Sequence, residues 1–263
     1  MPEFASLPPS QIVPILADRG EYICSESTFY RILRQEKMQH HRGRSKPPQK
    51  RPCPRLMASD PNHVYSWDIT FLPTEIKGKF YYLYLFVDIY SRYIVGWHID
   101  HYQDNKVSAD IFRQICISNN IDNTGLILHS DNGGAMKGAT MLATMQNLGV
   151  IKSFSRPATS NDNPFSEALF KTVKYCSCYP RRPFKDIEQA KQWMEKFAKW
   201  YNYEHRHSGI KFVTPHQRHM GLERDILDKR RQVYSEARAK NPGRWSSSIR
   251  CWEPADKVYI NPN

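Results

Sequence analysis

The segment VYSWDITFLP, residues 64–73, predicts a β-strand with an acidic residue at its centre. Aromatic and β-branched residues dominate it, as is typical of strands. Asp68 lies between Trp67 and Ile69, inside this apolar run. A charge in such a place costs free energy unless it is paired or bound to a metal ion. Asp68 is therefore the first candidate for a functional residue.

The segments that follow predict the rest of a sheet. KFYYLYLFVDIY (79–90) is too apolar for a strand exposed on both faces, and RYIVGWHI (92–99) predicts a third strand after a turn at Ser91 and Arg92. An order of three strands followed by alternating helices and strands predicts a mixed sheet with helices on both faces. The later elements are expected as helices over 104–120, 138–149 and from 164, and as strands over 125–130 and 150–155.

A second acid, Glu167, lies in SNDNPFSEALFKTVKY, residues 160–175, with Lys171 four positions later and Lys174 seven positions later. In a helix these three side chains share one face. Taken alone, the segment favours an ordinary ion pair on a solvated helix, because Glu–Lys pairs at this spacing are common. The alternative is a catalytic acid flanked by two lysines that bind phosphate.

Asp131 favours the second interpretation of Glu167, as a catalytic acid. It follows the apolar strand GLILHS directly, and 35 residues lie between it and Glu167. Sites in open α/β sheets usually lie at the C-terminal ends of strands. Asp68, Asp131 and Glu167 meeting at one point would repel one another, and Mg²⁺ or Mn²⁺ would compensate them. Two such ions can activate an attacking oxygen and stabilise a leaving oxygen at a phosphodiester. The alternative for Asp131, which precedes Asn-Gly-Gly, is a turn residue.

Two further acids have structural expectations. Asp88 ends the second strand beside Ser91 and Arg92, where a turn or structural role is expected. Asp162 precedes the helix that carries Glu167, and a capping role at the N-terminus of that helix is expected.

The charge of the chain is uneven. The formal net charge is +12, but residues 1–60 hold 10 Lys/Arg and 6 Asp/Glu, residues 61–180 hold 10 and 10, and residues 181–263 hold 18 and 10. A neutral middle between basic ends is typical of a chemical core with arms that bind a polyanion. The alternative is a basic soluble protein without such a partner. No run approaches ~18 apolar residues, so no membrane span is predicted.

Cysteine and histidine do not form a zinc pattern. The six cysteines contain no C-x-x-C pair, and they are interpreted as reduced thiols of an intracellular protein. His205 with His207, and His216 with His219, are spaced for metal binding, but structural roles are favoured.

The N-terminal part predicts two short helices, residues 9–20 and 25–38, with a turn near Gly20 and with Ser25 or Ser27 as the cap of the second. This is the outline of a helix-turn-helix. A basic, proline-rich segment follows, which suits phosphate contact better than a packed core. The side chains expected to face inward in the second helix are Phe29, Ile32 and Leu33.

After the core, helices are expected over 186–207, after Pro215 and over 224–242, and KVYI (257–260) could form a strand. The chain is therefore divided into a helical region (1–41), a basic linker (42–60), a catalytic core (61–220) and a basic extension (221–263).

Five motifs follow one another along the chain: SWDIT, VDIYSRYIVGW, HSDNGG, SRPATSNDNPFSEALFKTVKY and WYNYEHRHSGIKFVTP. Together they resemble the successive signatures of the integrase-core DDE transposases of bacterial insertion sequences, within the retroviral-integrase-like superfamily. More narrowly, they resemble the second-reading-frame protein of two-frame elements. The resemblance spans about residues 8 to 260.

The resemblance implies a ribonuclease-H-like α/β fold with a mixed five-stranded sheet. It implies that Asp68, Asp131 and Glu167 are the catalytic acids and metal ligands, for two Mg²⁺ or Mn²⁺ ions. The implied activity is DNA 3′-end cleavage and strand transfer, in a bacterial cytoplasmic protein that acts at the nucleoid. The implied partners are DNA, further copies of the chain and the first-frame protein of the same element. The residues expected to contact DNA are Lys171, Lys174, Arg42, Arg44, Lys46, Lys50 and Arg51.

Two alternatives stay open from the sequence: a catalytically inactive transposon remnant that only binds DNA, and a ribonuclease-H-like nuclease without strand transfer. The zinc module of retroviral integrases is not expected, because Cys24, His40, His41 and Cys53 lack its order and spacing. The start of the chain also lacks the first-frame helix-turn-helix and coiled-coil segment of a fused transposase.

Overall fold

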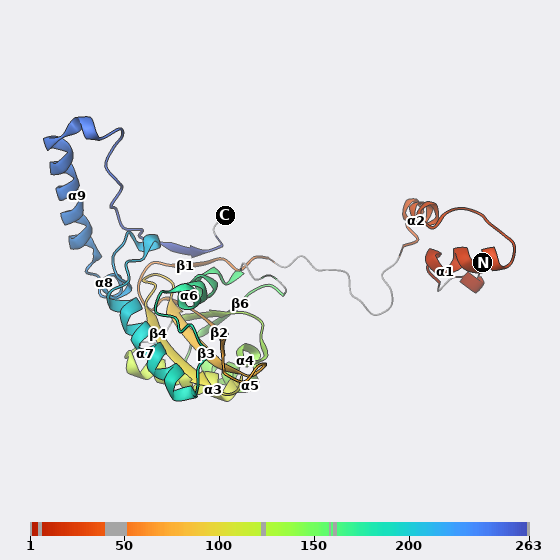
Figure 1. Ribbon diagram of the computed structural model, residues 1–263, viewed down its shortest axis with the longest axis horizontal. Helices are drawn as coiled ribbons and strands as arrows, with labels where there is room; N and C mark the ends of the chain where they lie inside the picture. The colour runs from red at the N-terminus through yellow and green to blue at the C-terminus, as the bar shows by residue number, and fades with distance from the viewer. Residues whose placement is uncertain are drawn as a thin grey trace. The chain divides into compact units, whose positions relative to one another are not determined.

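The computed structural model describes residues 2–4, 7–39, 52–121, 125–157, 159 and 162–261. The chain forms two compact units, Met1–Arg51 and Pro52–Asn263, shown in Figure 1.

The N-terminal unit is a pair of helices, α1 (Pro9–Asp18) and α2 (Glu26–Gln35), preceded by a short 3₁₀ turn, Pro2–Phe4. Gly20 has φ +82°, a left-handed conformation that favours glycine, and this ends α1 as predicted. Ser25 is the cap of α2, because its hydroxyl accepts a hydrogen bond from the backbone N–H of Thr28 at 3.3 Å. Ile32 does not face inward as expected, since it is 45% exposed.

The second unit is built on a five-stranded sheet in the order β4-β3-β2-β5-β6. Within this sheet β3 runs antiparallel to its neighbours β2 and β4, and β5 and β6 run parallel to β2. The mixed sheet predicted from the sequence is therefore confirmed. Its strands are β2 (Val64–Pro73), β3 (Phe80–Asp88), β4 (Ile94–Asp100), β5 (Ile127–Ser130) and β6 (Ile151–Phe154).

Alternate side chains of β2 face two different layers of helices, one on each side of the sheet. Tyr65 and Trp67 belong to the core under α3 (Asn105–Ser118) and α5 (Ala139–Asn147), where the Trp67 ring stacks on Phe86 at 4.9 Å between centroids. Leu72, on the opposite face, packs with Leu169 and Val173 of α6 and with residues of α7. Because side chains alternate in a strand, Ser66 and Asp68 lie on the face of Leu72. The helices of that face are α6 (Pro164–Tyr175) and α7 (Ile187–Tyr203).

The C-terminal part returns to the beginning of the unit. α8 (Pro215–His219) starts with a capping box formed by Thr214 and Gln217. α9 (Glu223–Lys240) projects as an arm, and the chain then returns to end in β7 (Val258–Ile260) (Figure 1). β7 pairs antiparallel with β1 (Leu56–Ala58), a strand that the sequence did not predict. The remaining short helices are α4 (Gly134–Lys137) and the 3₁₀ turns Ser208–Ile210 and Pro242–Arg244.

None of the helices in the described part of the chain combines the length and the apolar character that a membrane crossing requires.

Candidate active site

Parallel pairing of β2 and β5 brings two of the predicted acids to one edge of the sheet. The register pairs Trp67 with Ser130, so Asp68 and Asp131 are the next residues on neighbouring strands. β5 ends at Ser130, and Asp131 therefore lies at the C-terminal end of the strand, as predicted. β2 continues to Pro73 because β3 keeps pairing with it on the other side, which leaves Asp68 in mid-strand.

A buried hydrogen-bond network fixes the start of α6 to β2. The hydroxyl oxygens of Ser66 and Ser166 lie 2.6 Å apart. Ser66 also donates to the side-chain oxygen of Asn163, whose amide nitrogen donates to the carbonyl of Trp67 at 3.3 Å. Each of these polar side chains is at most 2% exposed. Glu167 directly follows Ser166, so this network holds the third acid on the same face as Asp68.

A second network fixes the loop after β5. The hydroxyl of Ser155 donates to Oδ1 of Asp131 at 2.7 Å. The side-chain amide of Asn132 donates to the carbonyl of Ser155. Ser155 directly follows β6, so the Asp131 carboxylate is oriented by the neighbouring parallel strand.

The three acids influence one another electrostatically. Burial raises the pKa of Asp68 to about 7, and the charges of Asp131 and Glu167 raise it as well, against a hydrogen bond from the Ile69 N–H. Burial and the charge of Asp131 raise the pKa of Glu167, which is exposed on the solvent side. A half-buried acid beside two others, one of them open to solvent, is an arrangement that a divalent cation would stabilise.

The carboxylate oxygens of the three acids are suitable ligands for a hard cation, but the three side chains do not surround one point closely. Among the residues that the structure describes, no three His, Cys, Asp or Glu side chains are grouped closely enough to hold a metal ion. Three carboxylates repel one another, and a divalent cation would compensate this repulsion. Meanwhile Oδ1 of Asp68 accepts from the Ile69 N–H at 2.7 Å, and Asp131 is held by Ser155.

Asp162 does not cap α6, which corrects the expectation from the sequence. Asn163 is the N-cap residue of α6, and its side chain makes no capping bond. Asp162 instead forms a fork with Arg156, accepting from its Nε at 2.9 Å, its Nη2 at 3.0 Å and its backbone N–H at 2.8 Å. This pairing lowers the pKa of Asp162 to about 2. His129 Nε2 lies 2.9 Å from the Asp162 carbonyl oxygen. Asp162 therefore links β5 to the segment that leads into α6.

Asp88 has the structural role that the sequence predicted. Its Oδ1 accepts from the backbone N–H of Ser91 at 2.7 Å and from the Ser91 hydroxyl at 3.0 Å. Its Oδ2 accepts from the Asn62 N–H at 2.5 Å. In the same turn Arg92, at φ +68°, places its guanidinium 4.0 Å from the centroid of the Phe165 ring in α6.

The expected DNA-contacting residues fall into two groups. Lys171 and Lys174 are exposed on α6, and the ion pairs found within the described chain do not include one between Glu167 and Lys171. The basic residues of the linker lie outside the described residues, and they are Arg42, Arg44, Lys46, Lys50 and Arg51.

Sequence reasoning missed the residues that orient the acids. A signal was present, because Ser66 precedes Asp68 by two positions in a strand and Ser166 is adjacent to Glu167. A small polar residue on the buried face of a strand needs a partner, but its identity depends on which helix covers that face.

Two family models match this chain. Residues 58–160 match one and residues 148–215 match the other, and both are described as Integrase core domain. The two matches together cover more than half of the chain. The chain belongs to the integrase-core family.

Relatives within this integrase-core family are transposases of insertion sequences, which confirms the resemblance drawn from the motifs. The transposase for insertion sequence element IS904 of Lactococcus lactis subsp. lactis (strain IL1403) is 31% identical over 159 residues, which are 60% of this chain and 61% of the relative. Transposase InsF for insertion sequence IS3A of Escherichia coli (strain K12) is 27% identical over 161 residues, which are 61% of this chain and 54% of the relative. The aligned part thus spans less than two thirds of either relative.

A solved structure shares the fold of this integrase-core chain. It is the cryo-EM structure of the simian T-cell lymphotropic virus intasome in complex with PP2A regulatory subunit B56 gamma. One of its chains has a TM-score of 0.51 and 18% sequence identity, over 79% of this chain and 70% of that chain. The sheet order and this likeness confirm the ribonuclease-H-like α/β fold.

Proposed function

We propose that the protein is a DDE transposase that cleaves DNA at a 3′ end and joins that end to target DNA. Asp68, Asp131 and Glu167 are its catalytic acids in this proposal. The observation that supports it is the meeting of these three acids on one face of an integrase-core sheet, where Asp131 and Glu167 raise the pKa of Asp68.

Two Mg²⁺ or Mn²⁺ ions held by the three carboxylates would activate the attacking oxygen and stabilise the leaving oxygen of a phosphodiester. Asp68 and Asp131 each have one oxygen that accepts a hydrogen bond from the protein, and the second oxygen of each would be the metal ligand. Glu167 stands at the open side, where DNA would enter. Lys171 and Lys174 would neutralise the phosphates beside the cut.

The reaction exchanges one phosphodiester for another. A water oxygen first forms a bond to phosphorus while the bond to the 3′ oxygen of the element end breaks, and that oxygen takes up a proton. The oxygen of the resulting 3′ hydroxyl then forms a bond to the phosphorus of a target phosphodiester and gives up its proton. The bond from that phosphorus to the 3′ oxygen of the upstream target fragment breaks, and this oxygen takes up a proton to become a 3′ hydroxyl. The number of phosphodiester bonds is unchanged by the second step, so no nucleotide cofactor is required. Positioning and charge neutralisation are the main contributions of the protein.

A cleavage and joining assay on labelled element-end DNA with Mg²⁺ tests the proposal. Asp131→Asn should abolish both products. Asp110→Asn is a matched control, because Asp110 is an exposed acid on α3 that pairs with Arg113 at 2.7 Å, and it should remain active. Full activity of Asp131→Asn would contradict the proposed roles. Joined product, cut product alone and bound DNA alone distinguish the transposase from the nuclease and from the inactive remnant.

We also propose that the protein acts as at least a dimer on paired DNA ends, and that the first-frame protein of the same element is a partner. Size analysis of the Asp131→Asn variant with and without element-end duplex tests the first part. A single copy on two bound ends would contradict it.

A further inference from the structure

Some arginines of the C-terminal arm form ion pairs with acids, and others contact only uncharged groups in the part of the chain that the structure describes. Arg224 of α9 pairs with Asp256 at 3.3 Å. Arg231 pairs with Asp228 at 2.5 Å and also with Glu253. Arg230, the residue before Arg231, makes different contacts. Its guanidinium donates to the backbone carbonyls of Lys211 at 2.8 Å and Phe212 at 3.0 Å.

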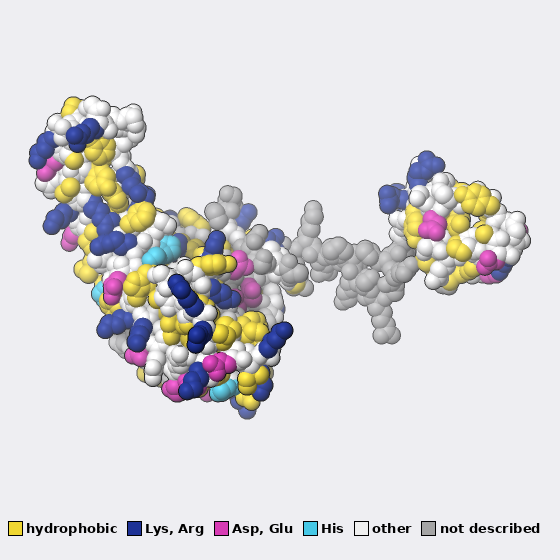
Figure 2. All heavy atoms as spheres, viewed as in Figure 1, with side chains coloured by type: hydrophobic (Ala, Val, Ile, Leu, Met, Phe, Trp, Pro, Cys, Tyr) yellow, Lys and Arg dark blue, Asp and Glu magenta, His cyan; other side chains and the backbone are white. Residues whose placement is uncertain are grey.

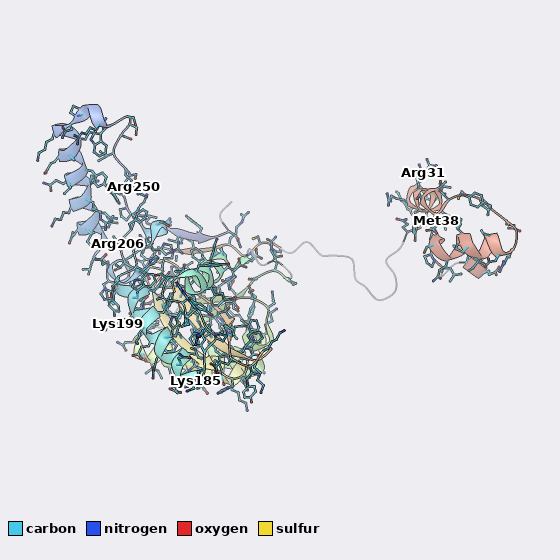
Figure 3. All side chains as sticks on the ribbon, viewed as in Figure 1. Arg31, Met38, Lys185, Lys199, Arg206 and Arg250 are labelled. Carbon is cyan, nitrogen blue, oxygen red and sulfur yellow. The ribbon has the colours of Figure 1, made fainter. Side chains whose placement is uncertain are left out.

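Two more arginines gather around the same loop. Arg206 donates to the carbonyl of Phe212 at 3.3 Å. The guanidinium of Arg250 lies 4.4 Å from the ring centroid of Phe212 and 5.3 Å from that of Trp252. Arg230 lies 5.4 Å from the Trp252 centroid. Arg206 and Arg250 are labelled in Figure 3, beside α9. We call Arg206, Arg230 and Arg250 the arginine cluster.

No acid neutralises the arginine cluster within the part of the chain that the structure describes. The ion pairs found there include none for these three side chains. Burial lowers the pKa of Arg230, and the positive charge of Arg206 lowers it further. Carbonyl oxygens and aromatic faces orient guanidinium groups, but they do not cancel their charge. The cluster therefore retains an electrostatic cost that an anion would relieve.

The loop that receives Arg230 is held in an uncommon conformation. Lys211 and Phe212 have φ +58° and +60°, so two successive non-glycine residues are left-handed. In this arrangement both carbonyls accept from Arg230 and the Phe212 ring lies beneath Arg250. A strained backbone persists only where the surrounding contacts hold it. Here the strained loop is a rigid support for the exposed guanidinium groups.

We propose that the arginine cluster binds phosphates of a DNA duplex away from the cleavage site. The inference rests on the proposed function, in which DNA is the substrate, and it adds a second, preorganised contact to that substrate. A planar guanidinium can bind a phosphate through two parallel hydrogen bonds, which a lysine cannot reproduce. Arg206 and Arg250 are exposed, and Figure 2 shows further Lys and Arg side chains along α9, which suits an extended polyanion. Contacts of this kind position a duplex without reading its sequence.

The test compares two double variants that each remove two positive charges. Both are made in the Asp131→Asn protein, and binding of a labelled duplex is measured without divalent metal over a range of salt concentrations. Arg206→Gln with Arg250→Gln should weaken binding at least about tenfold near 0.1 M salt. It should also make the salt dependence shallower by about 2, one for each phosphate that is no longer neutralised. Arg224→Gln with Arg231→Gln, which removes acid-paired arginines, should change the affinity by less than about threefold.

Each outcome is decisive for one of the two proposals. Unchanged binding by the Arg206/Arg250 variant, or equal losses in both variants, would overturn the arginine cluster as a site. Failure of the parent protein to bind any duplex would instead contradict the proposed function. Arg250→Lys keeps the charge but loses the planar stack, and it should bind more weakly than the parent. Arg206 and Arg250 are exposed, so their variants should melt like the parent, and Arg206→Gln alone should give an intermediate affinity.

Discussion

The hydroxyl oxygens of Ser66 in β2 and Ser166 in α6 lie 2.6 Å apart, although 100 positions separate them in the chain. Each serine is close in sequence to a proposed catalytic acid, Asp68 or Glu167. The orientation of Glu167 thus depends on a buried contact between a strand and a helix that form far apart in sequence.

Removing this contact should affect activity more than stability. Ser166→Ala should lower the free energy of unfolding by about 1–2 kcal/mol, because it leaves the Ser66 hydroxyl with one partner fewer. It should slow DNA joining by roughly tenfold to a hundredfold, since small misplacements of a catalytic group are costly. Denaturant unfolding and a joining assay measure the two effects. Thr172→Ala is the control, because it removes a hydroxyl that bonds only the Ala168 carbonyl in the same helix, and it should join DNA normally.

The stability of the metal-free protein should depend on pH through Asp68. Its pKa rises from 3.8 to about 7 on folding, so between these values the folded protein holds a proton that the unfolded chain has released. The contribution of Asp68 to stability is therefore most favourable below pH ~4 and is lost as the pH rises toward 7. At pH 8 with a chelator, Asp68→Asn should be more stable than wild type by on the order of 1–4 kcal/mol.

Denaturant unfolding over a series of pH values measures this effect of Asp68. The difference between wild type and Asp68→Asn should shrink toward pH 4. A stability difference that is constant with pH would show that the effect is not due to ionisation of Asp68.

The fork between Asp162 and Arg156 should contribute to stability with the opposite dependence on pH. The pKa of Asp162 is lowered to about 2, so its contribution is present above pH ~4 and is lost as the pH falls toward 2. Asp162→Asn should cost about 1–3 kcal/mol at pH 7, and less near pH 3. Thermal unfolding at several pH values measures this. Equal losses at pH 7 and pH 3 would rule out the charge of Asp162 as the cause.

Arg218 should be a strong determinant of stability. It is 1% exposed, pairs with Glu223 at 3.3 Å, and donates to the carbonyls of Tyr90 at 2.8 Å and Ala255 at 2.6 Å. Arg218→Met should cost about 3–5 kcal/mol, because Glu223 remains as a buried, unpaired charge. Adding Glu223→Leu should recover part of this loss. A double variant that is less stable than Arg218→Met would contradict this explanation.

The sequence predicted the sheet well because its strands are apolar and alternate clearly. The strand expected over 64–73 is found at Val64–Pro73, and α5 ends before Gly149 as expected. The candidate acids of the site were also found from the sequence, since an acid in an apolar strand requires an explanation.

Other features depend on distant partners and leave little trace in a local pattern. β1 has three residues, too few to show a period, and it exists because β7 pairs with it. Asp162 lies just before a helix, which is typical of a cap, but its carboxylate is bound by Arg156 instead of by the N–H groups of α6. The arginine cluster combines residues from three separate segments, so charge counts alone could not locate it.

Because Leu56–Ala58 pairs with Val258–Ile260, the second unit does not depend on an unbroken chain to keep its C-terminal part in place. The pairing joins the beginning of the second unit to its C-terminal part, and Arg218 adds a second contact with the returning tail through the carbonyl of Ala255. A single proteolytic cut in the exposed segment after α9 would therefore produce two fragments that remain associated under native conditions. By the same reasoning, a protein divided at that point and expressed as two polypeptides should reassemble, and the tip of the arm is the natural position for inserting a foreign domain.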